Sequence, residues 1–175
     1  MQKVMQKSTP KYFMYIGLTM VLVGLDQWTK QIAYQNLLGQ PPIDVLPILQ
    51  WVLVFNRGAA FGFLNQAGGI QHYFFVGLAM VISMILLVWL WRSFTHNRFL
   101  SWGLAMVLAG AIGNLIDRVL YRYVIDFISF HYQDWYFPAF NIADSAITLG
   151  AICLIADSFR FRGRDQGRSG RSGSE

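Results

Sequence analysis

Four apolar segments dominate the pattern of hydrophobic and polar positions along the chain, at about residues 12–33, 70–91, 97–118 and 140–160. Crossing the hydrocarbon core of a bilayer takes about 20 helical residues. The second segment meets this requirement without a single charge, and the other three meet it if their polar ends lie at the interface. The pattern therefore predicts an all-α membrane protein with four transmembrane helices.

The first segment has a polar residue within its expected span. Its apolar run from Tyr12 to Leu25 is about 21 Å of helix at 1.5 Å per residue. This is too short for a hydrocarbon core of about 30 Å. We therefore expect the helix to continue past Asp26, which places that carboxylate at or just within the membrane boundary.

Two loops are expected on the outer side of the membrane, at residues 39–69 and 119–137. The first alternates apolar and polar residues between Ile48 and Phe55 and ends in a glycine-rich turn, which predicts a small β-rich extension on the outer side. The second is rich in aromatic residues, which favour the headgroup level, and is expected to be an interfacial loop. Residues 1–161 form a single domain in this interpretation.

Composition and charge support a membrane location. With 55% hydrophobic and 13% charged residues, a soluble domain of 175 residues could not bury its apolar surface. Ten of the 14 lysines and arginines lie on one side in this topology: in the N-terminus, at the loop between the second and third segments (Arg92 and Arg98), and in the C-terminal region from Arg160 onward. The positive-inside rule then places both termini in the cytoplasm. The net charge of +5 is therefore a topology signal and predicts no nucleic-acid partner. The tail 162–175 is rich in Gly, Ser and Arg and is expected to be disordered.

Polar residues gather at the outer face in this topology. Ionisable groups at membrane depth are costly and by default mark a functional site. Two aspartates that share a proton can deprotonate a water molecule and protonate a carbonyl oxygen in the same site. The residues that the topology brings to this face are Asp26, Asn56, Arg57, Asn114, Asp117, Arg118, Asp126, Asn141 and Asp144.

Three of these carboxylates also have simpler interpretations. Asn141 and Asp144 have nearly the spacing of a capping box at a helix start. Asp117 beside Arg118 could form a plain ion pair, and Asp126 could be a solvated loop carboxylate. The sequence leaves these alternatives open.

Other catalytic chemistries have little support in the sequence. The chain has one cysteine and three scattered histidines, and Glu175 is its only glutamate. It also lacks the Gly-x-Ser-x-Gly and His-Glu-x-x-His motifs, so a serine nucleophile or a metal-bound water is poorly supported. We expect neither a metal nor a cofactor.

Five sequence blocks in order carry a family resemblance over about residues 10–160. They resemble the motif blocks of the lipoprotein signal peptidase (signal peptidase II) family, an aspartic peptidase family, at residues 26–30, 56–62, 113–118, 124–127 and 137–145. The resemblance implies a multi-pass enzyme of the bacterial cytoplasmic (inner) membrane with its active site near the periplasmic face. It implies removal of the signal peptide from diacylglyceryl-modified prolipoproteins by cleavage before the lipidated cysteine.

The resemblance also implies roles for individual residues. Asp126 and Asp144 match the catalytic dyad, and Asp117 looks like a supporting partner. The positions matching residues that bind the substrate or orient the dyad are Asp26, Lys30, Asn56, Gly58, Asn114, Arg118 and Asn141. The implied partners are lipid-modified prolipoproteins and membrane lipid, and we expect the chain to act as a monomer.

The strongest rival function is a small membrane transporter or proton pathway, because intramembrane carboxylates also relay protons. It would require polar residues near the midplane or at both faces, but the second segment has only Ser83 along its middle. A non-enzymatic scaffold is a third possibility, although it would not need so many desolvated carboxylates on one face. The one-sided cluster favours a hydrolase.

Overall fold

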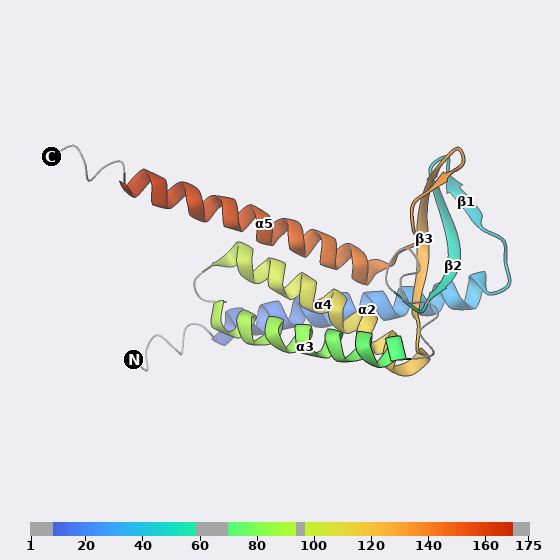
Figure 1. Cartoon of the computed structure of the whole chain (residues 1–175), viewed down its shortest axis with the longest axis horizontal. Coiled ribbons are helices and arrows are strands. Elements are labelled where there is room, and N and C mark those ends of the chain that lie inside the picture. The colour runs from blue at the N-terminus through green and yellow to red at the C-terminus, as the bar shows by residue number, and fades with distance from the viewer. Residues whose placement is uncertain (1–8, 59–69, 94–96, 170–175) are drawn as a thin grey trace.

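The computed structural model of the chain describes residues 9–58, 70–93 and 97–169. Long helices run alongside one another, and a small sheet lies at one end of the bundle, which we call the sheet end (Figure 1). The helices are α2 (Thr9–Leu37), α3 (Ile70–Ser93), α4 (Arg98–Tyr121) and α5 (Ile142–Ser169). The described chain begins and ends at the opposite end of the bundle. Some of the basic residues that support the topology prediction lie outside the described residues, namely Lys3, Lys7 and Arg171. His96 also lies outside them.

Three of the four described helices have the length and composition that the apolar segments predicted, and α2 is not among them. Within the described part of the chain, three are long and apolar enough to cross a membrane, at His72–Ser93, Arg98–Tyr121 and Ile142–Phe159. The expectation that the first helix continues past Asp26 is confirmed, because α2 ends only at Leu37. The chain is thus mostly helical with a small sheet, as predicted.

The sheet is antiparallel with strand order β1-β2-β3-β4. Strands β1 (Ile43–Leu46) and β2 (Leu49–Asn56) come from the first outer loop, where short strands were predicted. The glycine-rich turn predicted after them lies outside the described residues. The second outer loop, expected to be interfacial, contributes β3 (Val124–Tyr132) and β4 (Trp135–Tyr136) instead. Pairing with β2 gives the backbone groups of β3 partners that a free loop would lack.

Helix α4 is the central helix of the bundle, and it approaches α5 closely. A Cβ atom on Gly150 would lie 2.7 Å from the main-chain oxygen of Gly103, so only glycine permits this contact. The described part of α5 continues to Ser169, into the tail for which composition predicted disorder. Each added residue of a helix gains a hydrogen bond once the helix is nucleated, and α5 is already nucleated in the bundle.

Two apolar clusters hold the parts together. The first joins α2, α3 and α4 and includes Tyr15, Leu90 and Leu104, each at most 1% exposed. The second joins the sheet end of α2 to β3 through Ala33, Leu37 and Phe127. The sheet is therefore anchored to the helices by an apolar contact on one face of β3.

Candidate active site

Asp126 lies on β3 and is only 2% exposed. It is paired in register with Val54 of β2, next to an irregularity in that strand. Its Oδ2 accepts a hydrogen bond of 3.0 Å from the Asn56 amide, and its Oδ1 accepts one of 2.7 Å from the Asn141 amide. Asp126 is therefore not the solvated loop carboxylate that one interpretation of the sequence allowed.

Asp144 lies in the first turn of α5 and forms with Asn141 the capping box that one interpretation of the sequence allowed. The main-chain N–H of Asp144 donates to Oδ1 of Asn141 (3.0 Å), and the main-chain N–H of Asn141 donates to Oδ2 of Asp144 (3.2 Å). The box does not exclude a second role, because Oδ1 of Asp144 also accepts a 2.8 Å hydrogen bond from the Asn114 amide. Asn141 serves both carboxylates, since its amide donates to Asp126.

The start of α5 is held against β3 by main-chain hydrogen bonds. Phe140 and Ile128 form an antiparallel bridge, with N–H to oxygen distances of 2.9 Å in both directions. This bridge places Asn141, the next residue along, beside the strand that carries Asp126. The bridge therefore brings Asn141 into the same site as Asp126, which lies 15 positions earlier in the sequence.

Behind the two carboxylates lies a buried group of charged residues from α2 and α4. The Lys30 ammonium contacts Oδ2 of Asp26 at 2.8 Å and Oδ2 of Asp117 at 3.0 Å, and all three side chains are at most 2% exposed. Lys30 also donates to Oδ1 of Asn114 at 3.0 Å. Since an ammonium group can only donate, this contact fixes the Asn114 amide so that its NH2 group faces Asp144.

Both Asp126 and Asp144 line a groove of about 1000 Å³ at the sheet end. Arg118 lies in the same groove, with its guanidinium 5.6 Å from the centre of the Phe75 ring. The remaining wall is mainly apolar and aromatic and comprises Phe130, Trp135, Phe137, Pro138, Ala139, Phe140 and Leu149, with Asn56, Gly58, Ser145 and Thr148 as further polar or small members. A groove with two carboxylates, one guanidinium and aromatic walls suits an amphipathic substrate.

Burial raises the pKa of Asp126 to about 7, and the negative charge of Asp144 acts in the same direction. The hydrogen bond from Asn56 opposes this shift, because it stabilises the ionised form. A carboxyl group that titrates near neutral pH can hold a proton while its neighbour is ionised. The two groups can therefore act as an acid and base pair.

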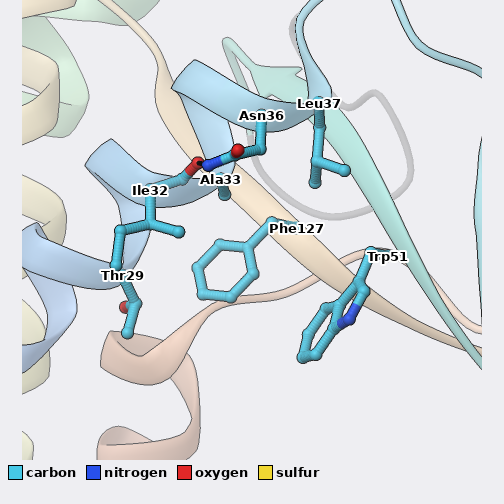
Figure 2. Close-up of a pocket in the computed structure, with 7 residues that line it drawn as sticks. All are labelled: Thr29, Ile32, Ala33, Asn36, Leu37, Trp51 and Phe127. Atoms are coloured by element: carbon cyan, nitrogen blue, oxygen red, sulfur yellow. Dashed lines mark hydrogen bonds between the residues drawn. The ribbon is translucent and has the colours of Figure 1, made fainter.

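A second, smaller cavity of about 280 Å³ lies between the sheet end of α2 and the sheet. In Figure 2, Phe127 and Trp51 lie opposite side chains of α2 that include Ile32, Ala33 and Leu37. The lining is nearly all apolar and has no charged group. Because Phe127 and Asp126 are neighbours on a strand, their side chains lie on opposite faces. This cavity is therefore separate from the groove with the two carboxylates.

The structure divides the residues predicted to bind substrate or orient the dyad into two sets. Asn56, Gly58 and Arg118 line the groove, and the Gly58 N–H donates to Oδ1 of Asn56 at 3.1 Å. The other four do not line the groove, and they support it through hydrogen bonds and ion pairs: Asp26, Lys30, Asn114 and Asn141.

One simple interpretation of the sequence is wrong. Asp117 does not depend on its neighbour Arg118, because it pairs with Lys30 in α2. Adjacent residues of a helix do not face each other, which explains the difference. The sequence reasoning also missed Gln27, whose amide donates to Oδ1 of Asp117 at 2.8 Å. Its polar side chain at membrane depth was the available signal.

The described residues contain no group of three or more histidine, cysteine, aspartate or glutamate side chains arranged to hold a metal ion. The polar groups that line the groove are carboxyl, amide, guanidinium and hydroxyl groups.

Comparison with known proteins places this site in a family. Residues 18–160 match the family model described as signal peptidase (SPase) II. A lipoprotein signal peptidase of Acinetobacter baylyi is 50% identical over 150 residues, covering 86% of this chain and 84% of that protein. One of Ectopseudomonas mendocina is 47% identical over 148 residues, covering 83% and 88%. One of Coxiella burnetii is 41% identical over 149 residues, covering 85% and 91%.

Solved structures agree with the sequence relatives. One described as a bacterial membrane enzyme, solved by the in meso method at 2.3 Å resolution, has a TM-score of 0.70 and 32% identity, covering 84% of this chain and 88% of that chain. A second, at 1.9 Å resolution, has a TM-score of 0.65 and 33% identity, covering 82% and 91%. The sequence blocks, the fold and these relatives together show that the chain belongs to the signal peptidase II family.

Proposed function

We propose that the chain removes signal peptides from bacterial prolipoproteins as an aspartic endopeptidase, with Asp126 and Asp144 as its catalytic dyad. The observation that carries the proposal is that these two carboxyl groups, from β3 and α5, line one groove. The names of the relatives, lipoprotein signal peptidases at up to 50% identity, support the substrate class.

The geometry supports a general acid and base mechanism. Asp144 lies at a helix N-terminus, which favours its negative charge, so it takes a proton from the attacking water molecule. Asp126 has a pKa of about 7 and holds a proton, which it offers to the oxyanion that develops on the scissile carbonyl. In each turnover a water O–H bond breaks as a carbon–oxygen bond forms. When the tetrahedral intermediate collapses, the carbon–nitrogen bond breaks, the proton on Asp144 passes to the leaving amine, and Asp126 recovers its proton from the intermediate's hydroxyl group.

The groove supports recognition of a lipid-modified substrate. Its apolar wall, with Phe137, Phe140 and Leu149, accepts the diacylglyceryl chains, and each buried methylene contributes about 0.8 kcal/mol. The Arg118 guanidinium is positioned to donate to a substrate carbonyl or a lipid phosphate. Cleavage before the lipidated cysteine follows if the lipid occupies the apolar part while the peptide lies across the carboxyl groups.

We infer four membrane spans, with α2 as the fourth. At 29 residues, α2 is about 43 Å long, which exceeds a hydrocarbon core of about 30 Å. Its sheet end with Asp26 and Lys30 then lies at the outer boundary. The described termini lie at the opposite end, which agrees with cytoplasmic termini and a periplasmic active site in the inner membrane. Residues 1–161 form one domain, and the chain acts as a monomer in this proposal.

A transporter or proton pathway is less favoured. In the described part of the chain, the buried charged side chains are Asp26, Lys30, Asp117 and Asp126, and all of them lie at the sheet end. A pathway across the bilayer would need such groups at greater depth as well.

The test uses purified full-length protein with a diacylglyceryl-modified proprotein and its unlipidated form. We expect cleavage of the lipidated form only, loss of cleavage in both Asp126→Asn and Asp144→Asn, and unchanged activity with a metal chelator. Cleavage that persists in both variants would contradict the dyad. Proton flux across vesicles without any cleavage would favour the transporter.

A further inference from the structure

Two aspartates outside the groove are among the most deeply buried charged groups of the described chain. Asp26 of α2 is 1% exposed and Asp117 of α4 is 0% exposed. Neither lines the groove that holds Asp126 and Asp144. Burying an ionised carboxylate is expensive unless it is paired and hydrogen-bonded, so the contacts of each oxygen show what these groups do.

Each buried aspartate holds the main-chain N–H of the residue directly before one proposed dyad aspartate. Oδ2 of Asp117 accepts a 3.0 Å hydrogen bond from the N–H of Ile125, which precedes Asp126. Oδ1 of Asp26 accepts a 2.8 Å hydrogen bond from the N–H of Ala143, which precedes Asp144. The same type of contact therefore fixes both chain segments that carry the dyad.

Two side chains of α2 connect the pair. The Lys30 ammonium contacts Oδ2 of Asp26 at 2.8 Å and Oδ2 of Asp117 at 3.0 Å. The Gln27 amide donates to Oδ2 of Asp26 at 3.2 Å and to Oδ1 of Asp117 at 2.8 Å. The four residues form one connected unit, which we call the buried bracket.

We propose that the buried bracket, formed by Asp26, Gln27, Lys30 and Asp117, positions the two dyad carboxyl groups relative to each other. Asp26 and Asp117 are positioning residues, because they act on Asp126 and Asp144 through the backbone and do not touch the substrate. The proposal deepens the proposed function and rests on its dyad.

Physical reasoning favours a positioning role over simple adhesion of the helices. Well-packed apolar residues often hold helices together as well as a buried ion pair does, without the desolvation cost. Hydrogen bonds with an ionised acceptor are shorter and roughly twice as strong as neutral ones. A bracket of such bonds can fix the positions of Ile125 and Ala143 to a fraction of an ångström, which proton transfer at the dyad requires.

The experiment measures two independent quantities on the full-length protein. Residue-specific amide exchange by NMR follows the N–H groups of Ile125 and Ala143, and cleavage of a diacylglyceryl-modified proprotein gives kcat and KM. The variants are Asp117→Leu, which removes the acceptor, and Asp117→Asn, which keeps an acceptor but removes the charge. The matched control is Asp157→Asn. Asp157 accepts hydrogen bonds of 2.7 and 2.6 Å from Asn97 at the other end of α4 and α5, so this change weakens a similar polar contact far from the dyad.

The proposal predicts that Asp117→Leu raises exchange at Ile125 and leaves exchange at Ala143 near the wild-type rate. It predicts a fall in kcat per folded molecule of about a hundredfold, with KM unchanged. Asp117→Asn should give a smaller fall of about tenfold, and Asp157→Asn should leave kcat and both exchange rates unchanged.

Unchanged exchange at Ile125 in Asp117→Leu would overturn the proposal, as would a wild-type kcat in a variant whose exchange is raised. If Asp117→Leu does not fold, the same two outcomes are judged on Asp117→Asn. If the wild-type protein cleaves no lipidated proprotein, the proposed function fails, whereas the exchange rates still show whether the bracket holds the two segments.

Discussion

Gly113 provides a steric test of the buried bracket that leaves every hydrogen-bonding group in place. A Cβ atom at this position would lie 2.6 Å from Oδ2 of Asp26 and 3.2 Å from Cβ of Ala143. Ordinary contact begins near 3.4 Å, so Gly113→Ala requires a displacement of about 0.8 Å, the difference between 3.4 and 2.6 Å. The Asp26 carboxylate cannot move freely, because it is 1% exposed and bonded to Lys30 and Ala143.

The expected effect can be worked out from these contacts. A displacement of this size can lengthen the 2.8 Å contact between Asp26 and Lys30 to about 3.6 Å, which is no longer a hydrogen bond. Overpacking of this kind lowers the free energy of unfolding by about 1–3 kcal/mol. Because a misplacement of about 1 Å can lower a rate a hundredfold, we expect kcat to fall by ten- to about a hundredfold with a smaller change in KM.

The assay is steady-state cleavage of a diacylglyceryl-modified proprotein, with thermal unfolding measured in the same detergent. Gly24→Ala is the matched control, because a Cβ atom there would meet nothing within 4 Å and the position lies on α2 near Asp26. We expect wild-type kcat in the control. A wild-type kcat in Gly113→Ala would refute the claim that the position of Asp26 matters to the dyad.

Three further predictions concern the two faces of β3. Activity should fall as the pH rises through about 7. The pKa of Asp126 is raised to that value, so above it Asp126 loses the proton that it offers to the oxyanion. A profile of kcat/KM that stays flat to pH 9 would contradict this. In Asn56→Ala the falling limb should move to higher pH, because the hydrogen bond from Asn56 lowers the pKa of Asp126 and its loss lets that pKa rise. An unchanged or lower midpoint would argue against this assignment. Phe127→Ala, on the opposite face, should lower the free energy of unfolding by about 3–5 kcal/mol. The side chain of Phe130 is 43% exposed in the groove, so Phe130→Ala should mainly raise KM. The reverse pattern in denaturation and kinetic measurements would show that the faces are misassigned.

The capping box shows how a structural and a chemical role can share residues. The spacing of Asn141 and Asp144 indicated either a helix cap or a site, and the structure contains the cap. The same Asn141 amide also donates to Asp126, and the remaining oxygen of Asp144 accepts from Asn114. The start of α5 and the proposed dyad are therefore built from the same hydrogen bonds, and a change in either residue should affect both.

The sequence by itself determined the helices and the side of the molecule on which the polar residues gather. Apolar segments of about 20 residues favour helices wherever their backbone groups cannot bond to water, and this depends only on local composition. The same reasoning predicted strands between Ile48 and Phe55, because alternation there has a period of two. It also indicated the residues of the site, since polar groups in apolar surroundings stand out without any knowledge of their partners.

Only the tertiary structure decided which of these polar groups meet. Asp117 pairs with Lys30, 87 positions earlier in the sequence, and not with its neighbour Arg118. Gln27 becomes part of the buried bracket through contacts with α4, and β3 forms by pairing with a strand about 70 residues earlier. Local pattern cannot specify such pairings, because the energy of a buried charge depends on which groups the folded chain brings within a few ångströms of it.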